Sequence, residues 1–294
     1  MKNRNFLLFF VFAAAFAPLT VQCQSGQAQK VRLIIRIDDM GCSHATNTGI
    51  REAYKEGIGK SVEVMVPTPW FPEAVSMLKE MPGLDAGVHL VLTSEWTNVK
   101  WRPLTQAPSL VNDWGYFYPM IWPNDRFPAG SALQEHPWDI KEVEKELRAQ
   151  IELAKREIPQ LSHLSSHMGC LNMNDETKAL FQKLGKEYGL DVFLEDYQVQ
   201  GMPGLGDNTL PAEKRVEKFI ENLRGLTPGN WLFVEHPAHD LPEQQAIGHP
   251  GYEHVATDRA GVLAMLTDPR VKAAISELGI EVISYADLKA VSRK

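Results

Sequence analysis

Residues 31 to 41, Val31-Arg32-Leu33-Ile34-Ile35-Arg36-Ile37-Asp38-Asp39-Met40-Gly41, form an apolar run that ends in two adjacent carboxylates and a glycine. Such a run is typical of a buried β-strand, and it carries the aspartates to the C-terminal strand end, where an α/β barrel places its reactive groups. Because successive side chains of a strand point to opposite faces, we expect different roles for Asp38 and Asp39. The pair also suits an Asx turn or a helix N-cap, so residues elsewhere must separate these alternatives.

Strand-like and helix-like segments alternate along the rest of the chain. The patterning predicts strands at 31–37, 62–66, 85–92, 163–167, 192–194, 229–234 and 281–283, and helices at 47–57, 72–81, 139–157, 177–188, 211–223, 258–266 and 271–278. Alternation of this kind favours a parallel sheet with helices outside it. We therefore expect an α/β protein with a single barrel-like domain that uses most of the 294 residues.

The composition excludes some classes of partner. The chain is 44% hydrophobic and 23% charged, which is typical of a globular protein. Its 37 acidic and 30 basic residues give a formal net charge of -7, and no stripe of lysine and arginine is present. A nucleic acid is therefore not expected as a partner, because phosphate backbones are bound by basic surfaces.

The first residues have the pattern of a secretory leader. Lys2 and Arg4 precede the apolar run 6–17, which is too short for a membrane span. Small residues near Ala28 suit cleavage after that position, and we expect an exported protein, periplasmic or extracellular. A lipid anchor on Cys23 is less favoured, because glutamine stands directly before it instead of a small residue.

The expected division is a signal peptide at 1–28 and a barrel domain at 29–294 that contains an aromatic-rich insertion at about 93–138. This insertion has little periodicity and is too long for an ordinary connection, and long loops of this kind are more often functional than idle. Its larger aromatic residues include Trp96, Trp101, Trp114, Tyr116, Tyr118 and Trp122. Aromatic faces suit stacking on sugar rings, although a loop of this size also uses tryptophan to build a core of its own.

Histidines stand at the ends of three further predicted strands, in Gly87-Val88-His89-Leu90, His163-Leu164-Ser165-Ser166-His167 and Glu235-His236-Pro237. Four strands thus carry aspartate or histidine to the same rim. Imidazole and carboxylate together suit a divalent transition ion with vacant positions for water, whereas calcium prefers oxygen ligands. An Asp-His-His triad of this kind would be a hydrolytic metal site. His89 alone would equally suit a core histidine bonded to a carbonyl.

His163 and His167 cannot both be direct ligands of one ion. On a continuous strand they share a face but stand about 13 Å apart, at ~3.3 Å per residue. One of them is therefore expected to pack or to support a ligand from behind.

The cysteines Cys42 and Cys170 either pair in an oxidising compartment or remain two buried thiols, and sequence alone does not choose between these alternatives.

Taken together, these motifs resemble the YdjC-like carbohydrate deacetylase family, which includes the chitooligosaccharide deacetylases. The resemblance runs from about residue 31 to 290 and rests on the aspartate pair and on Asn47-Thr48-Gly49-Ile50, Gly57-Ile58, Gly87-Val88-His89-Leu90-Val91-Leu92-Thr93, Ser162-His163-Leu164-Ser165-Ser166-His167 and Glu235-His236-Pro237. It implies a distorted (β/α) barrel of TIM-like type and a carbohydrate substrate.

The resemblance also implies roles for individual residues. It makes Asp39, His89 and His167 the ligands of one divalent metal ion, Asp38 the general base, and His236 the acid or the oxyanion stabiliser. Such an ion polarises the carbonyl and lowers the pKa of its water. Two imidazoles favour zinc by ligand softness, whereas the resemblance also admits magnesium.

This chain departs from the family pattern at two positions of one motif. The family usually shows Thr-His-x-Asp-x-His-x-His, and the segment 162–169 here has Ser165 in place of the aspartate and Gly169 in place of the last histidine. The retained His167 keeps the metal site, while substrate handling near these two positions is expected to differ. The familiar Asp-Asp-Phe is Asp-Asp-Met here, which is a modest change.

The leading hypothesis from sequence is a metal-dependent hydrolase that deacetylates an acetylated oligosaccharide or polysaccharide. One alternative keeps the metal and changes the bond to another ester, to a different amide, or to a glycosidic link cleaved through Asp38 and Glu235. The other alternative is an exported glycan-binding protein on an inactive barrel, with the aromatic insertion as its platform. The sugar, its linkage and the oligomeric state cannot be derived from the sequence.

Overall fold

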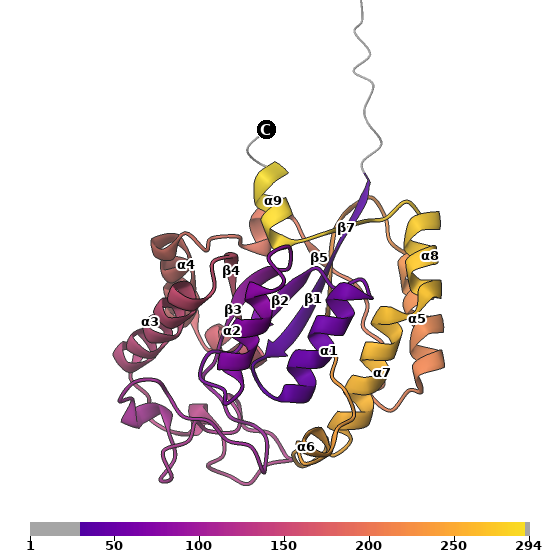
Figure 1. Cartoon of the computed structure of the whole chain (residues 1–294). Helices are drawn as coiled ribbons and strands as arrows, with labels where there is room; N and C mark the ends of the chain where they lie inside the picture. Colours follow the sequence, from indigo (N-terminus) through magenta and orange to yellow (C-terminus); the bar gives the residue numbers. More distant parts are fainter. Residues whose placement is uncertain (1–29, 292–294) are drawn as a thin grey trace, which may run out of the picture.

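The computed structural model describes residues 30–291. The predicted signal peptide, its cleavage point and Cys23 lie outside the described residues. Within them, no helix is both long and apolar enough to cross a lipid bilayer. One curled parallel sheet with helices on its outer side organises this part of the chain (Figure 1).

The sheet has the order β4-β3-β2-β1-β6-β5, with β7 paired to β1, and every pairing is parallel. The seven strands of the described part are β1 (Val31–Met40), β2 (Ser61–Val64), β3 (Asp85–Leu90), β4 (Leu161–Ser166), β5 (Gln200–Gly201), β6 (Gly229–Glu235) and β7 (Glu281–Ile283). The sheet curls without joining β4 to β5, so it forms a half-barrel. This architecture confirms the predicted distorted (β/α) barrel.

Helices follow most of the strands and cover the outer side of the sheet, with α1, α2 and α7 in front of it in Figure 1. The α-helices are α1 (His44–Lys55), α2 (Phe71–Lys79), α3 (Ile140–Glu157), α4 (Asp175–Tyr188), α5 (Ala212–Arg224), α6 (Pro242–Gln245), α7 (Val255–Thr267), α8 (Pro269–Glu277) and α9 (Tyr285–Val291). Short 3₁₀ turns lie at Pro108–Leu110, Leu133–Glu135, His167–Asn172 and Leu194–Tyr197. The predicted helices are thus present, with bounds shifted by a few residues.

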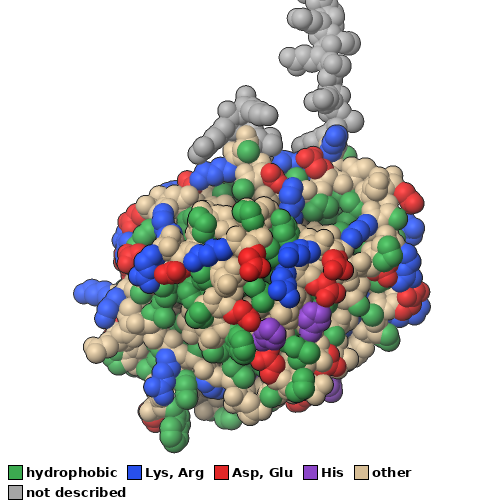
Figure 2. Space-filling model, viewed as in Figure 1, with side chains coloured by type: hydrophobic (Ala, Val, Ile, Leu, Met, Phe, Trp, Pro, Cys, Tyr) green, Lys and Arg blue, Asp and Glu red, His purple; other side chains and the backbone are tan. Residues whose placement is uncertain are grey.

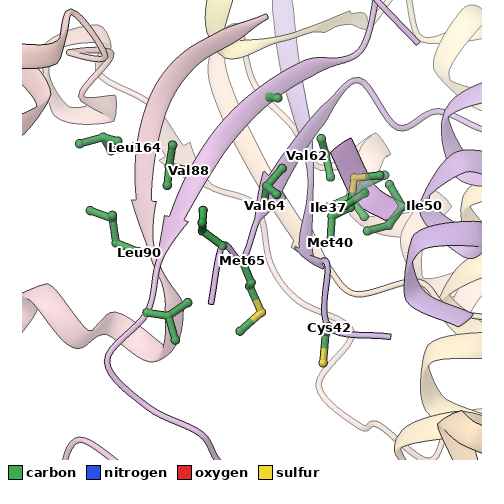
Figure 3. Close-up of a cluster of buried hydrophobic side chains, with 14 of the residues drawn as sticks. Ile37, Met40, Cys42, Ile50, Val62, Val64, Met65, Val88, Leu90 and Leu164 are labelled. Carbon is green, nitrogen blue, oxygen red and sulfur yellow. The ribbon is translucent and has the colours of Figure 1, made fainter. Parts of the chain in front are cut away.

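The main core lies between the sheet and these helices. Figure 3 shows outward-facing side chains of four neighbouring strands in this layer, among them Ile37, Val64, Val88 and Leu164, and all four are buried. Alternation along each strand then turns the residues between them to the concave side of the sheet. Among the buried polar residues of that side are Asp38, Glu63, His89, His163 and Ser165. The hydrophobic period of the strands thus determines which residues meet inside the half-barrel.

The predicted strand at 192–194 is wrong. No strand forms there; Leu194 begins a 3₁₀ turn, and Val192 packs with Ile34 and Tyr285 in a second, smaller apolar cluster. The apolar run therefore reflects burial of the segment, which periodicity alone cannot distinguish from strand pairing. Helices α6 and α9 and the two-residue strand β5 were not predicted. They are too short to show a period of their own.

The aromatic segment between β3 and α3 largely builds a core of its own. Trp96, Trp101 and Phe117 are buried in it, and its only regular pieces are two of the 3₁₀ turns. Two tryptophans remain at the surface: Trp114 is 77% exposed and Trp122 is 43% exposed. The structure therefore assigns most of the aromatic residues to packing and leaves a few rings free to contact a ligand.

The two cysteines of the described chain are separate. Cys42 and Cys170 are both free and buried, which corresponds to the alternative of two buried thiols. Burial raises the pKa of both thiols, that of Cys170 to about 12.

On the face that carries α1 and α7, Figure 2 shows lysine and arginine interspersed with aspartate and glutamate. This face therefore presents no basic field of the kind that binds phosphate backbones.

Candidate metal centre

Three strand ends bring Asp39, His89 and His167 together. Their ligand atoms all lie within 4.8 Å of one another. His167 Nδ1 is 3.4 Å from Asp39 Oδ1 and 3.4 Å from His89 Nε2, and His89 Nε2 is 3.8 Å from Asp39 Oδ1. Asp39 belongs to β1 and His89 to β3, and His167 directly follows β4. The structure thus assembles the three residues that the sequence had suggested as metal ligands.

The backbone of Asp39 departs from that of a regular strand. Its φ is +72°, and the pairing of β1 with β2 is irregular between Ile37 and Met40. Aspartate tolerates this left-handed region better than most residues, although such a conformation is still costly and concentrates at functional sites. The turn brings both carboxylates to the same side, since Asp38 Oδ2 lies 3.7 Å from His89 Nε2 and Asp39 Oδ1 lies 3.8 Å from it. Simple strand alternation, which predicted opposite faces, is therefore wrong here.

Asp39 has one oxygen bound and one free. Arg259 from α7 donates to Oδ2 at 2.6 Å, whereas the buried Oδ1 has no hydrogen-bond partner and faces both histidines. Burial would raise the pKa of Asp39, but Arg259 and His236 hold it well below its usual range. An ionised buried oxygen without a partner is rare. A cation between Asp39, His89 and His167 would satisfy it, so these residues fit a divalent metal.

The His89 ring is neutral. Burial lowers its pKa to about 4, although Asp38 and Asp39 act in the opposite direction. Its Nδ1 lies 2.7 Å from Ser165 Oγ, so Nε2 is the nitrogen that faces the two aspartates. A neutral imidazole with an unprotonated nitrogen is the form that binds a metal.

His167 is oriented by a carboxylate on its far side. Its Nε2 lies 3.1 Å from Glu95 Oε2, which leaves Nδ1 toward Asp39 and His89. Burial alone would lower the pKa of His167, but Glu95 and Asp39 raise it to about 10. A carboxylate behind a ligating histidine is a common arrangement in metal sites.

Asp38 lies beside the triad and forms an ion pair with an arginine. Arg36, two residues earlier on the same side of β1, donates from Nε and Nη2 to the two carboxylate oxygens at 2.8 and 2.7 Å. Burial would raise the pKa of Asp38, but Arg36 and His89 lower it. Asp38 is therefore ionised at neutral pH and lies close enough to the triad to accept a proton there.

His236 is the most open residue of the group. Its side chain is 38% exposed, and Nε2 lies 4.0 Å from Asp39 Oδ2. The segment that follows His236 packs tightly on α1: a Cβ at Gly49 would lie 2.7 Å from Ala238 Cα. Only a glycine permits this approach. The enclosed part of the ring is still desolvated, which lowers the pKa of His236 against the opposing effect of Asp39, so the ring is neutral at neutral pH.

Glu235 is not part of this group. It shares the outer face of β6 with Phe233, which packs against Phe219 of α5. Burial and Asp258 raise the pKa of Glu235 to about 7. Glu235 therefore faces the helices and does not form a pair of carboxylates with Asp38, which removes the basis for glycosidic cleavage through these two residues.

A cavity of about 580 Å³ reaches Arg36 and Ser165, the residues that contact Asp38 and His89. Serine, asparagine, lysine, glutamine and glutamate side chains line it together with aromatic rings: Ser166, Asn172, Lys178, Gln182, Phe193, Glu195 and Tyr285. Its rim includes Gly169, where a Cβ would lie 3.6 Å from the exposed ring of Trp122. A mixture of hydrogen-bonding groups and ring faces suits a hydroxylated ligand.

Residues 32–277 of this chain match the family model described as YdjC-like protein. The chain belongs to the YdjC-like family. Carbohydrate deacetylase 2 of Listeria innocua is 29% identical over 272 residues, covering 88% of this chain and 99% of that protein. A carbohydrate deacetylase of Thermus thermophilus is 30% identical over 239 residues, covering 73% and 80%.

A solved structure confirms the fold. A protein from Enterococcus faecalis, described as a cellobiose-phosphate cleavage protein, superposes with a TM-score of 0.71 at 26% identity. The match covers 88% of this chain and 99% of that one. The half-barrel is therefore common to both proteins.

Four residues that contact this centre were not predicted from the sequence: Arg36, Glu63, Glu95 and Arg259. Arg36 had a usable signal, because strand alternation puts it on the same side as Asp38. Glu95 lies in the irregular segment and Arg259 on α7, and no local pattern relates either of them to the aspartate pair. His163 was expected to support a ligand or to pack, and it does pack: its ring stacks on Tyr285 with centroids 3.7 Å apart.

Proposed function

We propose that this protein is an exported, metal-dependent hydrolase that removes acetyl groups from an oligosaccharide or polysaccharide. The observation that carries the proposal is the buried cluster of Asp39, His89 and His167, with Asp38 and His236 beside it. Relatives that cover most of the chain are named carbohydrate deacetylases. Export is supported by the leader pattern of the first 28 residues.

Asp39 Oδ1, His89 Nε2 and His167 Nδ1 would hold the ion. When bound, a divalent metal supplies Lewis acidity toward the acetyl carbonyl and lowers the pKa of a bound water. Two imidazoles with a single carboxylate favour Zn²⁺ by ligand softness. Mg²⁺ is the alternative ion to be tested at the same site. The roles of the two aspartates follow from their partners, because Asp39 has a free oxygen toward the histidines and Asp38 has both oxygens held by Arg36.

The chain's own residues supply proton transfer and charge stabilisation. Asp38 would accept the proton of the attacking water, and Arg36 keeps this carboxylate ionised. His236, neutral and partly exposed, would donate a hydrogen bond to the developing oxyanion or to the leaving group. The cavity that reaches Arg36 and Ser165 would receive the sugar.

Release of acetate from acetylated oligosaccharides tests the proposal. The purified mature protein is incubated with an acetylated oligosaccharide panel, and mass spectrometry follows the loss of single acetyl units before and after chelation. We expect chelator-sensitive deacetylation that Zn²⁺ or Mg²⁺ restores. Reducing ends that rise without acetate would contradict it, as would glycan binding by a metal-free protein that releases no acetate.

Metal binding should strengthen as the pH rises. His167 has a pKa of about 10 without metal, so it is protonated at neutral pH and must release a proton to become a ligand. His89, with a pKa of about 4, is already neutral. The affinity should therefore rise by about tenfold per pH unit, with about one proton released per ion, between roughly pH 6 and 9. Calorimetry in buffers of different ionisation enthalpy measures both quantities, and an affinity that stays constant over this range would contradict the expectation.

Trp122 should contribute to sugar binding. Its exposed ring lies beside Gly169 at the rim of the cavity. Loss of one stacked ring costs about 1 kcal/mol, so Trp122→Ala should raise the KM for an acetylated oligosaccharide roughly fivefold to tenfold, with little change in kcat. Trp114→Ala is the matched control: Trp122 lies beside Gly169, which lines this cavity, whereas Trp114 bonds through its backbone to Arg102, which does not. Equal effects of the two substitutions would argue against stacking at Trp122.

A further inference from the structure

A buried carboxylate from β2 reaches the metal-site histidine of β3 through a serine of β4. Glu63 and His163 are fully buried. Glu63 Oε2 accepts a hydrogen bond from Ser165 Oγ, whose oxygen lies 2.7 Å from His89 Nδ1. Glu63 Oε1 lies 2.5 Å from His163 Nε2. The residues form one continuous chain of polar contacts that ends at a proposed ligand.

We propose that Glu63, acting through Ser165, holds His89 in the tautomer and orientation that present Nε2 to the metal. Glu63 is thus a positioning residue, and it makes no contact with the ion or the substrate. The inference rests on the proposed metal site. It also accounts for Ser165, which stands where a carboxylate was expected in this motif.

The direction of the hydrogen bonds follows from counting protons. A serine hydroxyl has a single proton and can also accept hydrogen bonds. Because Glu63 is a carboxylate and only accepts, the proton of Ser165 goes to Glu63. Ser165 Oγ must then accept from His89, so the proton of the neutral His89 ring is on Nδ1. The lone pair of Nε2 consequently faces Asp38 and Asp39.

Two basic neighbours, His163 and Arg36, favour the ionised form of Glu63. Burial would raise the pKa of Glu63, but His163 and Arg36 lower it. The His163 ring is fixed on its other nitrogen by Ser162 Oγ at 2.7 Å, and its face stacks on Tyr285. A buried carboxylate with both oxygens bonded is a rigid acceptor, which is what a positioning group requires.

Gly87 permits this arrangement. In the sheet, Glu63 is paired with Gly87 of β3, and Gly87 is paired with His163 of β4. A Cβ at Gly87 would lie 2.5 Å from Glu63 Oε2 and would also collide with the His163 ring. The missing side chain therefore opens the path by which a carboxylate on β2 crosses β3 and reaches Ser165 on β4.

The tautomer of His89 in the metal-free protein is the direct test. Long-range ¹H–¹⁵N NMR distinguishes Nδ1–H from Nε2–H, and we expect Nδ1–H in the wild type. In Glu63→Gln the amide can donate to Ser165, which frees the serine proton for His89 Nδ1 and shifts the ring to Nε2–H. In Ser165→Ala the link between Glu63 and His89 is lost while the Glu63–His163 pair remains. The preference of His89 for Nδ1–H should therefore be lost in this variant as well.

Metal affinity provides the second readout. Zn²⁺ titration of each metal-free variant should show about 10-fold to 100-fold weaker binding, the usual effect of removing a group that orients a ligand. The double variant Glu63→Gln/Ser165→Asp returns a carboxylate to His89 directly and should recover both the Nδ1–H tautomer and most of the affinity. Glu146→Gln is the control, since Glu146 is another fully buried glutamate but binds the backbone of residues 104 and 105.

Persistence of the Nδ1–H tautomer in both single variants would overturn the inference. So would weak Zn²⁺ binding in Glu63→Gln alongside normal binding in Ser165→Ala, because the effect would then pass through His163 and not through Ser165. The proposed function fails by a different observation, which is a wild type that releases no acetate. In that case the NMR result still decides whether Glu63 sets the tautomer of His89.

Discussion

Replacement of Asp39 by asparagine should abolish metal binding and deacetylase activity together. Asp39 is the only carboxylate of the triad, and its buried Oδ1 has no other partner. Without its charge, two imidazoles remain as strong ligands, and the several kcal/mol of transition-state stabilisation that an ion supplies are lost. The expected fall in kcat/KM is on the order of 10³-fold or more. Metal analysis of the purified variant and acetate release measure the two effects.

The same substitution weakens the fold, and this effect must be separated from the loss of metal. Asp39→Asn leaves Arg259 buried without its anion, which costs about 3–5 kcal/mol in typical proteins. Asp258→Asn is the matched control: it breaks the pair with Arg215, which has the same 2.6 Å length, joins α5 to α7 and includes no residue of the triad. We expect comparable destabilisation of this control by thermal denaturation with its metal content intact. An Asp39→Asn variant that retains one ion per chain would contradict the assignment.

Asp38→Asn should slow turnover while leaving metal binding intact. Asp38 lies outside the triad, and Arg36 holds both of its oxygens. Loss of a general base lowers kcat by about 10²-fold to 10⁴-fold. The measurement is kcat on an acetylated oligosaccharide at saturating metal, together with Zn²⁺ titration. If Asp38→Asn abolishes metal binding and Asp39→Asn only slows turnover, the two roles are reversed.

The pH profile checks the same assignment without removing the carboxylate. Arg36 lowers the pKa of Asp38, so the base remains ionised as the pH falls. Arg36→Lys keeps a positive charge but loses the bidentate pair of hydrogen bonds to Asp38. The pKa of Asp38 should then rise, and activity should be lost at a higher pH on the acid side of the profile. An unchanged acid limb would indicate that a group other than Asp38 is the base.

Local patterns were sufficient for the strands that carry the centre. Apolar strand-like runs located β1, β3 and β6, the motif from His163 to His167 marked the end of β4, and an aspartate or histidine at each strand end indicated a common rim. This works because parallel strands in one sheet place their C-terminal ends at the same edge whatever the rest of the fold does. The segment at 192–194 shows the limit of the method, since burial without pairing produces the same apolar run.

Local sequence patterns indicated a parallel barrel-like domain with aspartates and histidines at one rim, because strand patterning and strand ends are local properties. The family resemblance then selected Asp39, His89 and His167 as the proposed ligands and Asp38 as the proposed base. How these groups are held depends on tertiary contacts. The left-handed turn at Asp39, the bond from Arg259 on α7 and the reach of Glu63 across Gly87 depend on contacts between residues far apart in the chain. The charge, the free oxygen and the histidine tautomer at the centre arise from those distant partners, and no local pattern records them.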